Sequence, residues 1–182
     1  VELGVVGEGT EMVDMSTTKS WEALPDDRKR YEAKRMAVYG GMVEAMDFHI
    51  GRLIDHLKAT GQYDNTLFVF TSDNGTEVSG ASDPNAPLAQ FFVGNQGYTT
   101  EYETLGLKGS FNSISPSFAS ASASPLAFYK FYAGEGGLRV PLIISGQLVV
   151  NKGELNHALS HVTDITPTIL SLAGIKAPDG RF

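Results

Sequence analysis

Two side chains with oxygen donors, Asp73 and Asn74, stand directly after a short apolar run in this chain. Residues 66–70 read Thr-Leu-Phe-Val-Phe, and a polar cluster ending in Gly75 follows them. A short apolar run bounded by turn residues is typical of a strand buried on both faces. Such strands belong to α/β sheets, which bind ligands at the carboxyl ends of their strands. A carboxylate and an amide carbonyl there would suit Ca²⁺ or Mg²⁺ better than zinc.

The same residues also fit an ordinary turn. Asn-Gly at 74–75 is a strong hairpin signal, and Asn-Gly-Thr at 74–76 is a formal glycosylation sequence. The choice between a metal site and a plain turn therefore depends on what the rest of the chain supplies.

A second segment rich in glycine and charge lies at residues 130–141, Lys-Phe-Tyr-Ala-Gly-Glu-Gly-Gly-Leu-Arg-Val-Pro. The pair Gly136-Gly137 permits a sharp turn with positive φ. Glu135 and Arg139 flank that turn, at a spacing that permits an ion pair. Lys130 would place a point charge near an anion held beside the metal. The alternative is a solvated loop whose lysine points to water.

Composition narrows the classes of partner. The chain has 182 residues, 21 acidic against 14 basic side chains, and a formal net charge of −7. This balance disfavours nucleic acid and anionic membranes as partners, so a site for an anion must be built locally. There is no cysteine, which excludes disulfides and thiolate metal sites. No apolar run reaches the roughly 18 residues that a membrane span needs.

The segments around these motifs alternate between helical and strand patterns, which is typical of an α/β protein. Residues 26–59 predict one long helix that is capped by Asp26 or Asp27, solvated over 28–35 and stopped by Gly61. Its apolar face recurs at steps of three and four residues: Tyr39, Val43, Met46, Ile50, Leu53, Ile54 and Leu57.

Strands are predicted at 66–72 and 140–145, separated by a long irregular stretch over 76–128. Residues 163–173 predict a second helix, with Thr163 as its cap and Gly174 as its stop. His157 and His161 have the spacing of a helical zinc pair. They lack the glutamate of metalloproteases and an evident third ligand, so we favour structural histidines.

Taken together, these segments resemble the sulfatase family, within the alkaline-phosphatase-like superfamily. The matching segments are Ser72–Gly75, Lys130, Glu135–Pro141, His161–Leu170 with Leu172–Gly174, and more weakly Asp47–Leu53. Gly109–Phe111 and Ser124–Lys130 look like the bacterial aryl/alkylsulfatase branch. The matches run from about residue 35 to 178 in the expected order.

The resemblance implies a part of an alkaline-phosphatase-like mixed sheet flanked by helices. It implies that Asp73 and Asn74 bind one calcium ion and that Lys130 contacts the sulfate group. The substrate would be a small-molecule aryl or alkyl sulfate ester, hydrolysed to an alcohol or phenol and inorganic sulfate. Fixed cations suit this reaction, because negative charge develops on the sulfate oxygens as the ester bond breaks.

The chain departs from the family at the nucleophile, a formylglycine made within a Cys/Ser-x-Pro-x-Arg motif. The nearest approach, Ser82-Asp83-Pro84-Asn85-Ala86, lacks the arginine and lies on the wrong side of Asp73. We therefore expect a fragment of a sulfatase, inactive alone, with the formylglycine upstream and the remaining calcium ligands outside the chain.

Residues 1–182 would form one partial catalytic domain. Its parts would be a connector at 1–27, the helix and metal-site strand at 28–75, an insertion bordering the active site at 76–128, and the Lys/Glu-Gly-Gly motif, strand and helix at 129–182.

Two other functions stay open. A phosphoryl or phosphonyl hydrolase of the same superfamily is disfavoured, because the two-metal members usually have His where this chain has Asn74. A degenerate, non-catalytic sulfatase module would explain the missing nucleophile. Retention of Asp73, Asn74 and Lys130 argues against it.

Overall fold

The computed structural model describes residues 7–11, 14–78, 87 and 90–176, and divides the chain into two compact units, Val1–Leu148 and Val149–Phe182. No helix among the described residues is long and apolar enough to cross a membrane.

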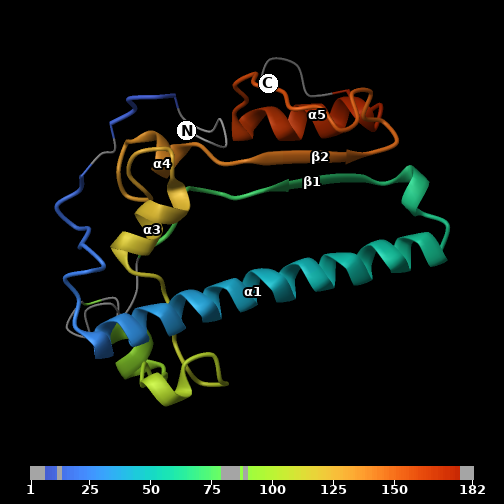
Figure 1. The fold of residues 1–182 in the computed structure, drawn as a ribbon. Coiled ribbons are helices and arrows are strands. Elements are labelled where there is room, and N and C mark those ends of the chain that lie inside the picture. Colours follow the sequence, from blue (N-terminus) through green and yellow to red (C-terminus); the bar gives the residue numbers. More distant parts are fainter. Residues whose placement is uncertain (1–6, 12–13, 79–86, 88–89, 177–182) are drawn as a thin grey trace. The chain divides into compact units, whose positions relative to one another are not determined.

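The longest element is the helix α1, Asp26–Ala59 (Figure 1). Its extent confirms the helix predicted from the apolar period. Pro25 precedes the first turn, so Asp26 and Asp27 lie within that turn and are not its caps. Their charges there favour the positive end of the helix dipole. Thr60 caps the other end, and Gly61 follows with a φ of 69°.

The prediction that residues 28–35 are solvated is wrong at two positions. The side chains of Glu32 and Arg35 are buried, with 4% and 2% of their surface exposed. Arg35 Nη1 lies 3.2 Å from Glu32 Oε1, and Arg35 Nη2 donates a 2.7 Å hydrogen bond to Ser113 Oγ. Arg28 completes the cluster at 2.6 Å from Glu32. Ion pairs and a hydrogen bond therefore allow this turn of α1 to be buried, and a hydrophobicity pattern does not reveal them.

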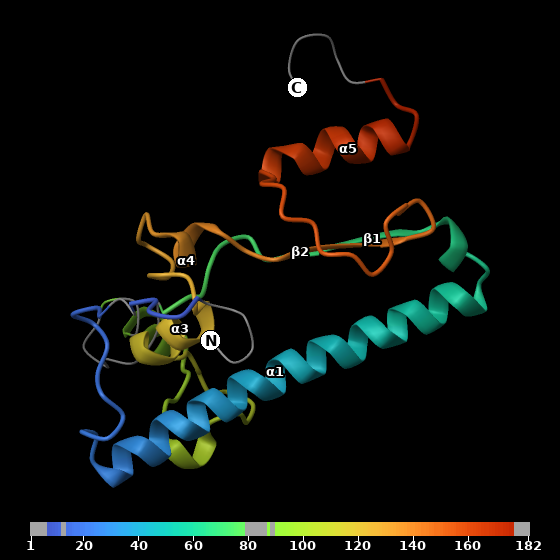
Figure 2. The ribbon, with the colours of Figure 1, turned by 45° about the horizontal axis from the view of Figure 1, so that its top comes forward.

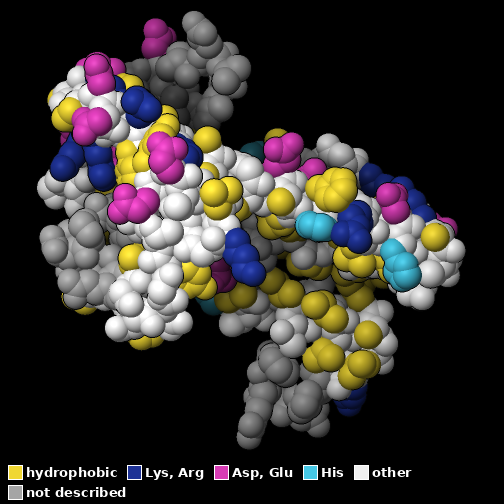
Figure 3. All heavy atoms as spheres, turned by 90° about the horizontal axis from the view of Figure 1, so that it is seen from below, with side chains coloured by type: hydrophobic (Ala, Val, Ile, Leu, Met, Phe, Trp, Pro, Cys, Tyr) yellow, Lys and Arg dark blue, Asp and Glu magenta, His cyan; other side chains and the backbone are white. Residues whose placement is uncertain are grey.

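The apolar face of α1 is only partly covered within the described residues. Met36 and Tyr39 pack on the core, whereas Val43, Met46 and Leu53 are more than two-fifths exposed. Hydrophobic side chains are accordingly visible at the molecular surface (Figure 3).

The sheet of the first unit consists, in the described part of the chain, of β1 (Leu67–Thr71) and β2 (Leu142–Gly146). They pair antiparallel, with Leu67 opposite Gly146 and Thr71 opposite Leu142, and they run side by side in both ribbon views (Figures 1 and 2). The expectation that β1 is buried on both faces is not met. Its residues are mostly half-buried and those of β2 are mostly exposed, because each strand has a single neighbour here.

The core of this unit gathers Met15, Ile114, Ala119 and Tyr129. The helix α3, Pro116–Ala123, contributes Ala119. It lies in the stretch predicted to be irregular. Its start carries a recognisable signal, because Ser115 accepts a hydrogen bond from the Phe118 amide and a proline opens the first turn.

Tyr129 joins the N-terminal segment to this core. Its hydroxyl lies 2.6 Å from Thr17 Oγ1, and 2% of the residue's surface is exposed. Burial raises the pKa of the Tyr129 phenol, and the hydrogen bond with Thr17 opposes that shift.

Shorter elements complete the described chain. They are the 3₁₀ turns Tyr63–Asn65, Tyr102–Thr104 and Val162–Asp164, the π-helical turn Gln90–Asn95, and the single-turn helix α4, Glu135–Leu138. The second unit contains α5, Ile165–Leu172, followed by Gly174 with a φ of 69°.

The predicted cap Thr163 is wrong, because a 3₁₀ turn precedes α5. His161 caps that turn by accepting a hydrogen bond from the Thr163 amide, and Asp164 accepts one from the His161 amide.

Candidate functional site

The antiparallel pairing brings both sequence motifs to one edge of the sheet. Ser72, Asp73 and Asn74 leave β1 at the edge where Pro141 leads into β2. Thr71 Oγ1 donates a 3.0 Å hydrogen bond to the Pro141 carbonyl oxygen, which joins the two chain segments at that point. The candidate metal ligands therefore lie beside the Glu-Gly-Gly segment, at the carboxyl end of β1 and the amino end of β2.

Two backbone hydrogen bonds extend this junction beyond the sheet. The amide of Gly75 donates to the carbonyl of Gly137 at 3.0 Å, and the amide of Lys130 donates to the carbonyl of Thr76 at 3.0 Å. The segment after β1 is thus held at two points along 130–137, which limits how far Asp73 and Asn74 can move relative to Lys130.

The glycines of this junction are required by close approach. A Cβ on Gly75 would lie 1.9 Å from the Gly136 carbonyl oxygen, and one on Gly136 would lie 2.1 Å from the Phe128 carbonyl oxygen. The positive φ that Gly136-Gly137 permits is not adopted: both residues lie in α4, and neither has a positive φ. Backbones that nearly touch, and not an unusual dihedral, exclude side chains here.

The predicted ion pair across α4 is confirmed. Arg139 Nη1 lies 3.1 Å from Glu135 Oε2, one helical turn away. Both side chains are more than half exposed, so the pair adds little stability.

The ammonium of Lys130 forms an ion pair with the carboxylate of Glu77. It also lies 5.5 Å from the ring centre of Phe131. Its neighbourhood contains two unusual backbone conformations, since Phe128 and Phe131 have positive φ values of 71° and 80°. Bulky residues rarely adopt such values, and conformations of this kind cluster at functional sites.

An open groove of about 770 Å³ runs along this edge. Asp73, Asn74 and Glu77 line it, as do Arg139 and Pro141 near the start of β2. Further wall is supplied by Tyr39 and Met42 of α1, by residues 111–114 and by residues 122–126. The lining of the groove thus combines polar side chains with several apolar and aromatic ones, as ligand sites commonly do.

The oxygen donors of Asp73 and Asn74 suit a hard cation. Asn74 Nδ2 donates a 2.9 Å hydrogen bond to the Gly75 carbonyl oxygen. The side-chain oxygen of Asn74 therefore points away from that carbonyl. The Asp73 carboxylate is exposed to solvent. Calcium takes about six to eight oxygen ligands, and no cluster of three His, Cys, Asp or Glu side chains exists among the described residues. These two residues would therefore supply only part of a calcium site.

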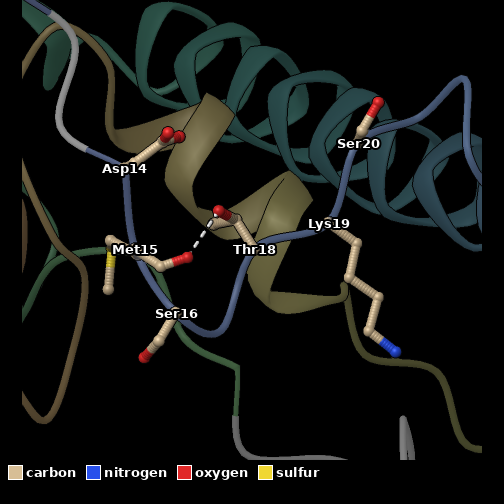
Figure 4. A pocket seen from close by; sticks show the side chains of 6 residues that line it. All are labelled: Asp14, Met15, Ser16, Thr18, Lys19 and Ser20. Carbon is tan, nitrogen blue, oxygen red and sulfur yellow. Dashed lines mark hydrogen bonds between the residues drawn. The ribbon is translucent and has the colours of Figure 1, made fainter.

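Other candidates do not form a comparable site. A hollow of about 500 Å³ is lined by one continuous segment, Asp14–Ser20, in which Asp14 and Lys19 point in different directions (Figure 4). The zinc interpretation of His157 and His161 has no support, since residues 151–161 are not helical and His161 is the cap described above. The segment Ser82–Ala86 lies outside the described residues.

Comparison with known proteins identifies the family. The sulfatase family model matches residues 11–175, which is most of the chain. The chain belongs to the sulfatase family.

Two curated relatives and one solved structure agree with this assignment. An uncharacterized sulfatase of Schizosaccharomyces pombe is 36% identical over 183 residues, which cover 100% of this chain and 33% of that protein. An arylsulfatase of Klebsiella aerogenes is 35% identical over 175 residues, covering 95% of this chain and 37% of that protein. The chain spans about a third of the length of these relatives.

The solved structure, of Ps i-CgsB in complex with k-i-k-neocarrahexaose, matches with a TM-score of 0.50 and 31% identity, over 87% of this chain and 25% of that one. The fold is α/β of the alkaline-phosphatase-like type, and the two strands and their helices are a part of it.

Proposed function

We propose that this chain is part of a calcium-dependent sulfatase that hydrolyses aryl or alkyl sulfate esters to an alcohol or phenol and inorganic sulfate. The observation that carries the proposal is the groove at the sheet edge. Asp73 and Asn74 lie there together with Glu77, the ion-pair partner of Lys130. The relatives named sulfatases favour the same chemistry.

Each residue has a role that its chemistry permits. Asp73 and Asn74 hold the calcium ion through hard oxygen atoms. The ion, when bound, orients the sulfate group and neutralises charge that develops on its oxygens. Lys130 adds a second fixed cation beside that group, and it needs no proton transfer to do so.

The organic part of the ester lies, in this proposal, along the apolar wall of the groove. Tyr39, Met42, Phe111 and Leu126 are its largest members. Their mixed aromatic and aliphatic surfaces suit a phenyl ring or an alkyl chain better than a highly charged group. This wall supports the aryl or alkyl specificity that the sequence resemblance implies.

The nucleophile is assigned outside residues 1–182, as a formylglycine, and so are the other ligands of the calcium ion. The chain alone is therefore expected to be inactive. The proposal applies to the protein in which this chain and a Cys/Ser-x-Pro-x-Arg segment occur together.

The test compares two esters that share one leaving group. The protein carrying both segments is assayed with para-nitrophenyl sulfate and para-nitrophenyl phosphate, with calcium and after chelation. The proposal expects the sulfate to be hydrolysed in a calcium-dependent manner and at a higher kcat/KM than the phosphate. Preference for the phosphate would assign the protein to the phosphoryl hydrolases. Absence of hydrolysis of either ester would favour the non-catalytic module.

A further inference from the structure

Glu77 is the partner of the candidate sulfate-binding lysine, and no motif considered above includes it. Its carboxylate contacts the ammonium of Lys130, and it lines the same groove as Asp73 and Asn74. The residue that holds the ammonium of Lys130 therefore belongs to the lining of the groove in which a calcium ion and its anion would lie.

Backbone hydrogen bonds support the pairing of Glu77 with Lys130. The Lys130 amide donates to the carbonyl of Thr76, the residue immediately before Glu77. Gly75, two residues before Glu77, is bound to Gly137 through its own amide. These two bonds hold the backbone of Lys130 beside the residues that immediately precede Glu77.

The conformation around Lys130 adds a second constraint. Phe128 and Phe131 adopt left-handed backbone conformations on either side of it. Such a conformation is unfavourable for a phenylalanine, and it persists only where its surroundings enforce it. The resulting bend brings the ring of Phe131 within cation–π distance of the ammonium.

The stability that the ion pair itself contributes does not explain this arrangement. About a third of each side chain is exposed, 34% for Lys130 and 36% for Glu77. Ion pairs that are exposed to this degree contribute little to stability. A free lysine side chain, however, has high rotamer entropy, which it loses when it is fixed in one position. Holding it in place before the substrate arrives removes part of that cost from binding.

We propose that Glu77 is a positioning residue that holds the Lys130 ammonium at the groove for a tetrahedral oxyanion, the sulfate group of the ester. An ammonium has three N–H donors, so one directed at Glu77 leaves two for oxygens of the anion. Glu77 acts through Lys130 and makes no contact with the reacting atoms. The inference rests on the proposed function for the identity of the anion.

A double-mutant cycle in the protein that carries this chain and the nucleophile segment tests the inference. The variants are Glu77→Gln, Lys130→Ala and both together. We expect Glu77→Gln alone to lower kcat/KM about tenfold, within the range of measured couplings between contacting residues. In the Lys130→Ala background the same change has no further effect, because the group that Glu77 positions is gone. Glu103→Gln, an exposed change of equal charge, serves as the matched control.

Three results would overturn the inference: an equal loss with and without Lys130, no loss, or a gain in kcat/KM. A gain would mean that Glu77 competes with the substrate for the ammonium. Titration with inorganic sulfate and inorganic phosphate in the presence of calcium separates this inference from the proposed function. If the unaltered protein hydrolyses no sulfate ester, the proposed function fails. The same cycle measured on anion affinity still decides whether Glu77 acts through Lys130.

Discussion

The amide of Gly75 donates a 3.0 Å hydrogen bond to the carbonyl of Gly137, and this bond joins the two segments that the sequence motifs single out. Gly75 follows the candidate ligands Asp73 and Asn74, and Gly137 lies in α4, two residues before Arg139. Neither segment can shift alone, because the strand ends and the backbone bonds connect them. Groove geometry therefore depends on small residues at this contact.

Replacing Gly75 by alanine is predicted to damage both stability and metal binding. The added Cβ would lie 1.9 Å from the Gly136 carbonyl oxygen, which belongs to backbone and cannot rotate away. Overpacking of this kind costs about 1–3 kcal/mol. We expect a lower free energy of unfolding in chemical denaturation and weaker calcium binding in a titration of the folded fraction.

Gly41→Ala in α1 is the matched control. A Cβ there has nothing within 4 Å, and the position is helical. Alanine should stabilise the helix by about 0.5–1 kcal/mol relative to glycine. Equal effects of the two substitutions would show that the contact between Gly75 and α4 is not tight.

The sequence predicts the elements of this fold better than their burial. The 3.6-residue period of α1 and the apolar runs of β1 and β2 are strong local signals, and all three elements are present within a few residues of their predicted bounds. Burial depends on neighbours. Glu32 and Arg35 are buried because they pair, and β1 is half-buried because, among the described residues, β2 is its one neighbouring strand.

The candidate site, too, can be predicted only in part from the sequence. Asp73, Asn74 and Lys130 are identifiable from motifs, because their residue types and order are distinctive. Glu77 is not, since one glutamate in a loop resembles any solvated side chain until Lys130 is seen beside it. The close approach of Gly75 and Gly136 to other backbones likewise appears only in three dimensions.

Loss of Arg35 is predicted to be strongly destabilising. Its guanidinium is buried between Glu32 and Ser113, and burial lowers its pKa while Glu32 opposes that shift. Removing one partner of a buried ion pair costs about 3–5 kcal/mol. Arg35→Ala should lower the free energy of unfolding by an amount near this range, measured by denaturant titration.

Arg28→Ala removes the other cation that contacts Glu32, and it is the matched comparison. The Arg28 side chain is 41% exposed, so its removal should cost about 1 kcal/mol or less. If Arg35→Ala and Arg28→Ala lower the free energy of unfolding by the same small amount, the buried pair does not hold α1 to residues 111–114.

Alkaline pH is predicted to destabilise the first unit through Tyr129. Burial raises the phenol pKa above its ordinary value of 10.0, so the folded state favours the neutral form. This contribution is fully present below pH 10 and is lost as pH rises through the folded-state pKa. Unfolding free energies measured from pH 8 to 12 should fall at the alkaline end.

Tyr129→Phe should flatten that alkaline decline, because no proton is left to lose at this position. The exposed tyrosine change Tyr98→Phe should keep the decline, since Tyr129 remains. If the alkaline decline in unfolding free energy is unchanged in Tyr129→Phe, other titrating groups cause it.

The central claim is that Asp73 and Asn74 bind the calcium ion on which sulfate-ester hydrolysis depends. The most direct measurement is a calcium titration of the protein that carries this chain and the nucleophile segment. It is made on the unaltered protein, on Asp73→Ala and on the exposed helical control Asp55→Ala. Hydrolysis of para-nitrophenyl sulfate is assayed in parallel. We predict that Asp73→Ala weakens calcium binding at least tenfold, a loss of about 1.4 kcal/mol or more, and reduces hydrolysis, while Asp55→Ala matches the unaltered protein. Unchanged calcium affinity and activity in Asp73→Ala would contradict the account.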